Sequence, residues 1–180
     1  SAYTAFPMKG VRRSPLLVTH IEDSDGNIVA QFAPRVREVI SEEAAYKMIV
    51  LMQGVMNGGT GSRMRNRYKI MADMGGKTGT TNDNSDGWFM GFTPTLVSGA
   101  WVGGEERDIH FDNMTDGQGA AMALPIWGLY MQKVFADKSL GYSQEDEFEI
   151  PEGFDPCKDI LMTEDAPAME ENEGLDNLFE

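Results

Sequence analysis

Three β-prone runs follow one another between residues 75 and 102 with very little chain between them, and this spacing restricts the fold more than any other feature. The runs cover residues 75–81, 87–92 and 96–102, and they are joined by a polar turn and by Thr93-Pro94-Thr95. Parallel neighbours in a sheet need a crossover of a dozen or more residues, which these links cannot provide. The sequence therefore predicts a three-stranded antiparallel meander.

Other segments predict a hairpin and two helices around this sheet. Residues 16–21 and 27–32 flank the turn-forming run Asp23-Ser24-Asp25-Gly26, which indicates a hairpin. Ser41 can cap a helix that Gly58-Gly59 ends, and its apolar positions fall on one face. Residues 119–135 are apolar on nearly every side, which favours a buried helix, and Pro125 suggests a regular part beginning near Leu124. The expected fold class is α/β of the α+β type, with an antiparallel sheet and packed helices.

The charge of the chain is concentrated at its C-terminal end. Residues 1–141 carry 15 acidic and 14 basic side chains, whereas residues 142–180 carry 14 acidic and one basic. We expect a domain over 1–141 and a largely disordered acidic tail over 142–180, whose deletion leaves the fold intact. A neutral body with an acidic tail argues against nucleic acid as a partner. The lone Cys157 excludes a disulfide framework, and neither a metal nor a cofactor is expected.

The sequence matches three known functional motifs only in part, and each lacks a required residue. Gly76-Lys77-Thr78 resembles the end of a P-loop, but Met71 stands where the first glycine is required. The run from Asn82 to Gly87 resembles a calcium loop, but Thr93 replaces its bidentate glutamate. His20 and His110 have no Gly-x-Ser-x-Gly elbow to accompany them, so a serine triad is not supported.

What remains is a strand that carries Lys77, Thr78 and Thr80, with Gly79 between the two threonines. Residues two apart on a strand share a face, so the two hydroxyls can hold a carboxylate together, and a nearby ammonium favours an anionic substrate. The glycine-rich loop Gly59-Thr60-Gly61 is expected to line the same cleft. The basic cluster of Arg63, Arg65, Arg67 and Lys69 is either a solvated face or a local contact for an anion.

The same strand carries a family resemblance. The runs 77–83, 86–94 and 100–103, with Lys77-Thr78-Gly79 at their start, closely resemble the third motif and following strands of class A penicillin-binding proteins. The resemblance covers roughly residues 1–137. It implies a β-lactamase/transpeptidase-like fold and an acyl-transfer site for D-Ala-D-Ala stem peptides and β-lactams. In that reading Lys77 and Thr80 are catalytic, Thr78, Gly79, Thr80 and Thr81 bind substrate, and the Thr80 backbone N–H is an oxyanion-hole donor.

The chain departs from this family in what it lacks. No serine is followed by lysine three residues on, since Ser62 is followed by Arg65, and the runs beginning at Ser24 and Ser85 end in glycine where the S-x-N motif has asparagine. We therefore expect the C-terminal part of a transpeptidase domain, a partial fold that is inactive alone and not acylated by penicillin. Its missing strands would leave an exposed sheet edge that favours self-association.

Further expectations concern the parent protein and the alternative functions of the chain. The resemblance implies a bifunctional peptidoglycan synthase with a glycosyltransferase domain, anchored on the extracytoplasmic or periplasmic face of a bacterial membrane. No stretch of this chain resembles a signal peptide or a membrane span, so such signals would lie outside it. The alternatives are a non-catalytic module that binds stem peptides or proteins, and a D,D-carboxypeptidase or β-lactamase-like hydrolase.

Overall fold

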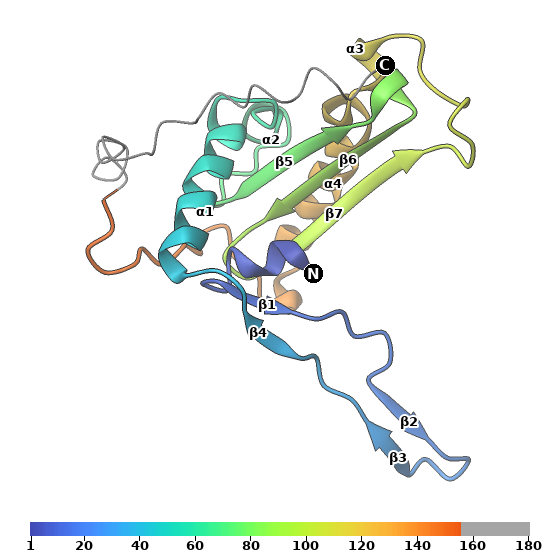
Figure 1. Ribbon diagram of the computed structural model, residues 1–180, viewed down its shortest axis with the longest axis vertical. Helices are drawn as coiled ribbons and strands as arrows, with labels where there is room; N and C mark the ends of the chain where they lie inside the picture. Colours follow the sequence, from blue (N-terminus) through green and yellow to red (C-terminus); the bar gives the residue numbers. More distant parts are fainter. Residues whose placement is uncertain (156–180) are drawn as a thin grey trace, which may run out of the picture.

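The computed structural model describes residues 1–155 and is a mixed α/β structure around a three-stranded sheet (Figure 1). The sheet consists of β5 (Gly75–Thr80), β6 (Asp86–Phe92) and β7 (Val97–Gly103), in that order and antiparallel throughout. The predicted meander is confirmed, because the short links leave no room for a crossover. Both β5 and β7 are edge strands of this sheet in the described chain.

Helix α4 (Gly119–Ala136) covers one face of the sheet, which is the rear face in Figure 1. Trp127 contacts Phe89 and donates a 2.8 Å hydrogen bond to Ser98 Oγ, so the helix is tied to two strands. The expectation of a regular helix starting near Leu124 is wrong, because Pro125 lies inside a helix that already begins at Gly119. Burial of the first turns against the sheet offsets the lost proline N–H. The opposite side of α4 is exposed, so the prediction of burial all round holds for one face only.

Helix α1 (Glu42–Asn57) lies beside β5 (Figure 1) and supplies the rest of the core. Its predicted cap is confirmed, since the Ser41 hydroxyl accepts from the Ala44 N–H at 3.2 Å. Its buried face includes Ile49, Met52 and Met56, as the spacing of apolar residues predicts. The short helix α2 (Arg63–Asn66) follows, and Met64 on it is fully buried.

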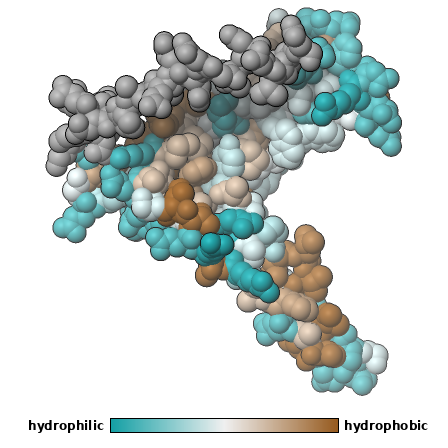
Figure 2. Space-filling model, in the orientation of Figure 1, coloured by the Kyte–Doolittle hydropathy of each residue, from teal (hydrophilic) through white to brown (hydrophobic). Residues whose placement is uncertain are grey.

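A long two-stranded arm extends away from this body (Figure 1). At its base β1 (Val11–Arg13) pairs with β4 (Val36–Glu38), and nearer its tip β2 (His20–Glu22) pairs with β3 (Ile28–Gln31). The predicted hairpin is confirmed in β2 and β3. Figure 2 shows that hydrophobic residues cover much of the arm.

Four shorter elements complete the described chain: η1 (Ala2–Ala5), η2 (Asn82–Asn84), α3 (Met114–Gly117) and η3 (Lys138–Leu140). Between residues 1 and 155, no helix combines the length and the apolar character that crossing a membrane requires.

The part of the expected tail that the structure describes, residues 142–155, differs from the expectation of disorder. Phe148 is buried against Phe92, with ring centroids 5.7 Å apart, and its N–H donates to Asp73 Oδ2 at 3.1 Å. Tyr46 of α1 contacts the Phe154 ring. Isolated aromatic residues in an acidic run therefore anchor it to the body. The remainder of the tail, with Cys157, lies outside the described residues.

Candidate functional site

The free edge of β5 presents a row of backbone groups beside the two threonines. The Thr81 N–H donates to Asp86 O at 3.1 Å, and the register pairs Gly79 with Trp88 and Thr80 with Gly87. Because the pairs of an antiparallel ladder alternate, odd-numbered residues of β5 point their N–H and C=O groups at β6. The N–H groups of Thr78 and Thr80 consequently point away from β6, toward the open edge.

The Thr78 and Thr80 side chains share one face of the sheet, as predicted from the strand period. Thr78 stands opposite Phe89, and Thr80 stands opposite Gly87. The Thr60 hydroxyl lies 3.3 Å from the Thr78 hydroxyl, so the loop after α1 does come to the strand.

That loop is held tightly against its own helix. A Cβ at Gly59 would lie 2.9 Å from Val55 Cα, and one at Gly61 would lie 2.7 Å from Met56 Sδ. Both distances are shorter than a carbon atom tolerates. The two glycines therefore let the loop turn back, and this turn places Thr60 beside β5.

The Thr80 hydroxyl is oriented by the first turn of α4. Its Oγ1 accepts a 2.9 Å hydrogen bond from the Gly119 N–H, one of the helix donors that have no partner inside the helix. A hydroxyl has one proton and two lone pairs, so accepting this bond leaves its own O–H free to donate. The arrangement suits an anionic acceptor such as a carboxylate.

Lys77 reaches the same edge from the other face of the sheet. The register places it opposite Met90, and its ammonium donates to the Thr78 carbonyl oxygen at 2.7 Å. The lysine is exposed, so its charge stands at the open edge beside the two hydroxyls. The Lys77 ammonium and the outward-pointing N–H groups of Thr78 and Thr80 therefore lie along the same open edge.

Thr81 and Gly79 have a more local setting. The Thr81 hydroxyl lies 3.0 Å from Ser85 Oγ, donates to Asp86 O and accepts from the Asp86 N–H, so it closes the turn between β5 and β6. We assign Thr81 to that turn. A Cβ at Gly79 would make only an ordinary 3.4 Å contact with Trp88 Cβ, and nothing in the described residues requires glycine there for space.

The basic cluster is largely used by the fold itself. Arg63 donates to Ala120 O at 3.2 Å, and Arg65 donates to Ala72 O at 2.7 Å. The Arg67 guanidinium lies 5.7 Å from the centroid of the Tyr68 ring. These contacts brace α2 against α4 and the approach to β5, which a count of charges in the sequence could not reveal.

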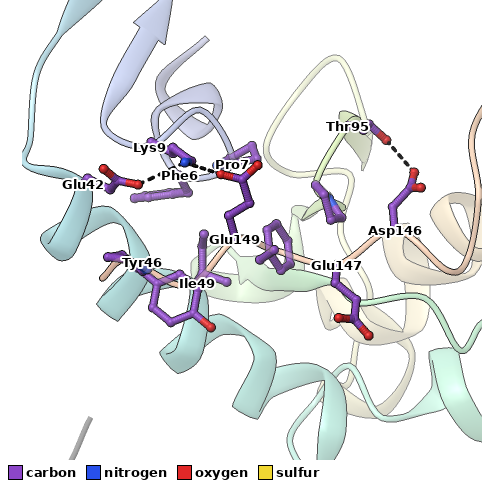
Figure 3. Close-up of a pocket in the computed structure, with 13 residues that line it drawn as sticks. Phe6, Pro7, Lys9, Glu42, Tyr46, Ile49, Thr95, Asp146, Glu147 and Glu149 are labelled. Carbon is purple, nitrogen blue, oxygen red and sulfur yellow. Dashed lines mark hydrogen bonds and ion pairs between the residues drawn. The ribbon is translucent and has the colours of Figure 1, made fainter. Parts of the chain in front are cut away.

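A separate pocket of about 360 Å³ lies between residues 6–9, helix α1, the β6–β7 turn and residues 146–151 (Figure 3). Lys9 points into it between Glu42, at 3.2 Å, and Glu149. Hydrogen bonding to Glu149, and then to Glu42, raises the pKa of Lys9, and the same contact lowers the pKa of Glu149. Sequence patterns do not predict this pocket, because Phe148 and Glu149 lie in an acidic run for which disorder is expected.

Neither histidine joins a catalytic group in the described chain. His20 lies 3.0 Å from Glu22 on the exposed arm, and the His110 ring contacts Phe111 O at 3.2 Å. No cluster of three or more His, Cys, Asp or Glu side chains suited to a metal occurs among residues 1–155. The site therefore consists of the hydroxyls, ammonium and N–H groups at the β5 edge.

Comparison with known proteins shows the family of the chain. The penicillin binding protein transpeptidase domain matches residues 1–102, which is more than half of the chain. Penicillin-binding protein 1A of Aquifex aeolicus is 34% identical over 151 residues, covering 84% of this chain and 19% of that protein. The chain belongs to the family of penicillin-binding-protein transpeptidase domains. It spans about a fifth of the length of the curated relatives that it matches.

Solved structures show the same fold. Penicillin-binding protein 1A of Haemophilus influenzae superposes with a TM-score of 0.68 at 23% identity, covering 83% of this chain and 26% of that chain. The PonA1 protein of Mycobacterium tuberculosis, solved in complex with penicillin V, gives a TM-score of 0.63 at 20% identity and covers 84% and 39% respectively. The described fold therefore corresponds to part of the chain in each of these structures.

Proposed function

We propose that this chain is one wall of the active site of a peptidoglycan D,D-transpeptidase, which forms a serine acyl-enzyme and is inhibited by β-lactams. The observation that carries the proposal is the open edge of β5, where Lys77, Thr78 and Thr80 meet. Membership of the transpeptidase family supports the same chemistry. The nucleophilic serine and the S-x-N motif belong to the rest of the domain.

The hydroxyls of Thr78 and Thr80 bind the terminal carboxylate of the stem peptide or of the β-lactam. The Thr80 proton is available because its oxygen accepts from the Gly119 N–H. The Thr78 proton is available when Thr60 is the donor of the hydrogen bond between the two hydroxyls, in which either can donate. Hydrogen bonds from neutral donors to a charged group contribute about 1.5–3 kcal/mol each. The two threonines therefore set the register of the substrate along β5.

The Thr80 N–H supplies one donor of the oxyanion hole. It points out of the sheet toward the edge, where the carbonyl of a substrate laid along β5 would come. Lys77 holds its ammonium beside that position and stabilises negative charge as the serine proton is transferred. The serine forms an ester with the penultimate D-Ala as the bond to the terminal D-Ala breaks and that residue leaves. An acceptor amine then takes the acyl group from the serine, which restores the free hydroxyl.

The parent protein is proposed to be an exported, membrane-anchored synthase with a glycosyltransferase domain outside this chain. The family and the relatives named penicillin-binding protein 1A support this assignment. The 180-residue chain is expected to be inactive alone, because it lacks the acylated serine. Neither the non-catalytic module nor the hydrolase is favoured by any contact in the described residues.

Acylation of the full-length parent by a fluorescent penicillin tests the proposal. Thr78→Val and Thr80→Val are each expected to lower the acylation rate constant tenfold or more, following the loss of a charged hydrogen bond. Thr95→Val is the matched control, because Thr95 lies at the far end of the sheet and contacts Asp146. Equal acylation by all three variants would contradict the proposed roles, and mass spectrometry showing acylation of the isolated chain would contradict the missing nucleophile.

A further inference from the structure

The arm of residues 11–39 is a two-stranded ribbon that the rest of the described chain leaves largely uncovered. Strands β2 and β3 contact mainly each other, and a mostly apolar groove lies between the two ladders of the arm, lined by residues 14–18, 21, 32–33 and 35. Figure 2 shows the hydrophobic colouring of this part of the arm. Leu17 is 97% exposed, and Ile21 and Phe32 on the groove are 50% and 46% exposed. Because isolated two-stranded hairpins are marginal in water, such a ribbon gains stability when its apolar groove is covered.

The charges on the arm are separated along its length. Its base carries Arg12, Arg13, Arg35 and Arg37 with one acidic residue, Glu38, for a net charge of +3, and its tip carries Glu22, Asp23 and Asp25, for −3. Arg12 stands directly opposite Arg37 in the β1–β4 ladder, which is an unfavourable pairing of like charges. Within residues 1–155 none of the four arginines forms an ion pair. The body of the molecule therefore provides no ion-pair partner for the arginines at the base, within the described residues.

We propose that the arm is a dimerisation element that pairs with the arm of a second copy, antiparallel to it. In that arrangement the basic base of each arm meets the acidic tip of the other, and the two apolar grooves cover each other. The surface is complementary to itself, as a two-fold interface requires. Since the arm points away from the body, the two bodies lie at opposite ends of the pair (Figure 1).

The acidic tip distinguishes this arrangement from two others. An anionic lipid surface would attract the arginines but repel Glu22 and Asp25, which lie beyond the groove. Association through the open edge of β7 would use backbone groups on the sheet and would not depend on the charges of the arm. The proposal is independent of the transpeptidase function proposed above.

Two charge-reversal variants of the 180-residue chain test the proposal. A base variant, Arg35→Glu with Arg37→Glu, changes the net charge of the base from +3 to −1. A tip variant, Glu22→Lys with Asp25→Lys, changes that of the tip from −3 to +1. Asp23 is left unchanged because its carboxylate accepts the Asp25 and Asn27 N–H groups that form the turn. Each variant alone is expected to weaken self-association at least tenfold in sedimentation velocity experiments, and more so at low salt.

An equimolar mixture of the two variants provides the decisive result. Each acidic end then meets a basic end of the other variant, so the mixture is expected to form a heterodimer as tightly as the wild-type homodimer. Leu17→Gln serves as an apolar test, since its exposed side chain has no role in the fold of the monomer. Circular dichroism checks that every variant remains folded.

Three outcomes would overturn the proposal. The wild-type chain could remain a monomer at every concentration, or the variants could associate as the wild type does, or their mixture could fail to recover association. Binding of the monomer to phosphatidylglycerol vesicles, lost in the base variant and retained in the tip variant, would assign the arm to a lipid surface instead.

Discussion

Gly119 connects the fold to the site, and replacing it with alanine gives a sharp test of that connection. Its N–H orients the Thr80 hydroxyl at 2.9 Å, and its Cα sits against the strand pair itself. A Cβ there would lie 2.3 Å from Gly79 O and 2.6 Å from Trp88 O. Both are backbone atoms of the sheet, so no side chain can turn aside to make room. The start of α4 must move.

The size of the effect follows from these contacts. Ordinary contact distances are about 3.5 Å, so the helix has to retreat by roughly 1 Å, far enough to break the hydrogen bond to Thr80. Forcing extra volume into a packed site costs about 1–3 kcal/mol, and the lost hydrogen bond costs about 1 kcal/mol. The better helix propensity of alanine returns less than about 1 kcal/mol at this terminal position. Gly119→Ala is therefore expected to lower the free energy of unfolding by about 2 kcal/mol.

Urea unfolding of the 180-residue chain measures this change, and Gly54→Ala is its matched control. Gly54 lies within α1, and a Cβ there would meet no atom within 4 Å. The same substitution at Gly54 is expected to raise the free energy of unfolding by about 0.5–1 kcal/mol. The two substitutions are thus expected to change the free energy of unfolding in opposite directions. A Gly119→Ala protein as stable as the wild type would refute the close approach of α4 to β5.

Three further predictions concern the packing of the chain. Phe148→Ala should lower the free energy of unfolding by about 3 kcal/mol in urea, since it empties a buried aromatic site. Trp127→Phe should cost about 2 kcal/mol in the same assay, through lost volume and the lost bond to Ser98. Lys9 lowers the pKa of Glu149, so the stabilisation from this pair is present above the ordinary value of 4.5 and is lost as the pH falls through the lower folded value. NMR titration of Glu149 should show the lowered midpoint, and Lys9→Met should restore it.

Local sequence patterns are sufficient to predict most helices and strands of the molecule. The cap at Ser41, the turn at Gly26 and the short links around β6 each act within a few residues, so the sequence alone predicts the helix, the hairpin and the meander. The docking of Phe148 depends instead on a cavity formed by Phe92 and by α1. A single aromatic residue in an acidic run does not reveal such a partner.

The start of α4 at Gly119, rather than near Leu124, is not predicted from the sequence for a related reason. Pro125 is a local signal against a helix, and it is correctly read as the loss of one hydrogen bond. What offsets that loss is the burial of the first turns of α4 against the sheet, together with the hydrogen bond from Gly119 to Thr80, 39 residues earlier in the chain. Tertiary contacts of this kind override local propensity, and a lone sequence does not contain them in readable form.

The strand register decides which groups of β5 face its open edge, and glycines opposite each other help to hold that register. Gly76 stands opposite Gly91, and a Cβ at Gly91 would lie 2.5 Å from the Trp127 ring. A slip of one residue would turn Lys77 toward α4 and move the two threonines to the other face. Sequence alone places Thr78 and Thr80 on a common face, but it does not say which N–H groups point at the open edge. The Trp127 indole fills the space over Gly91, and the Phe89 ring and the Met56 sulfur lie over Gly76. This packing favours the register in which the Thr80 N–H points at the open edge of β5.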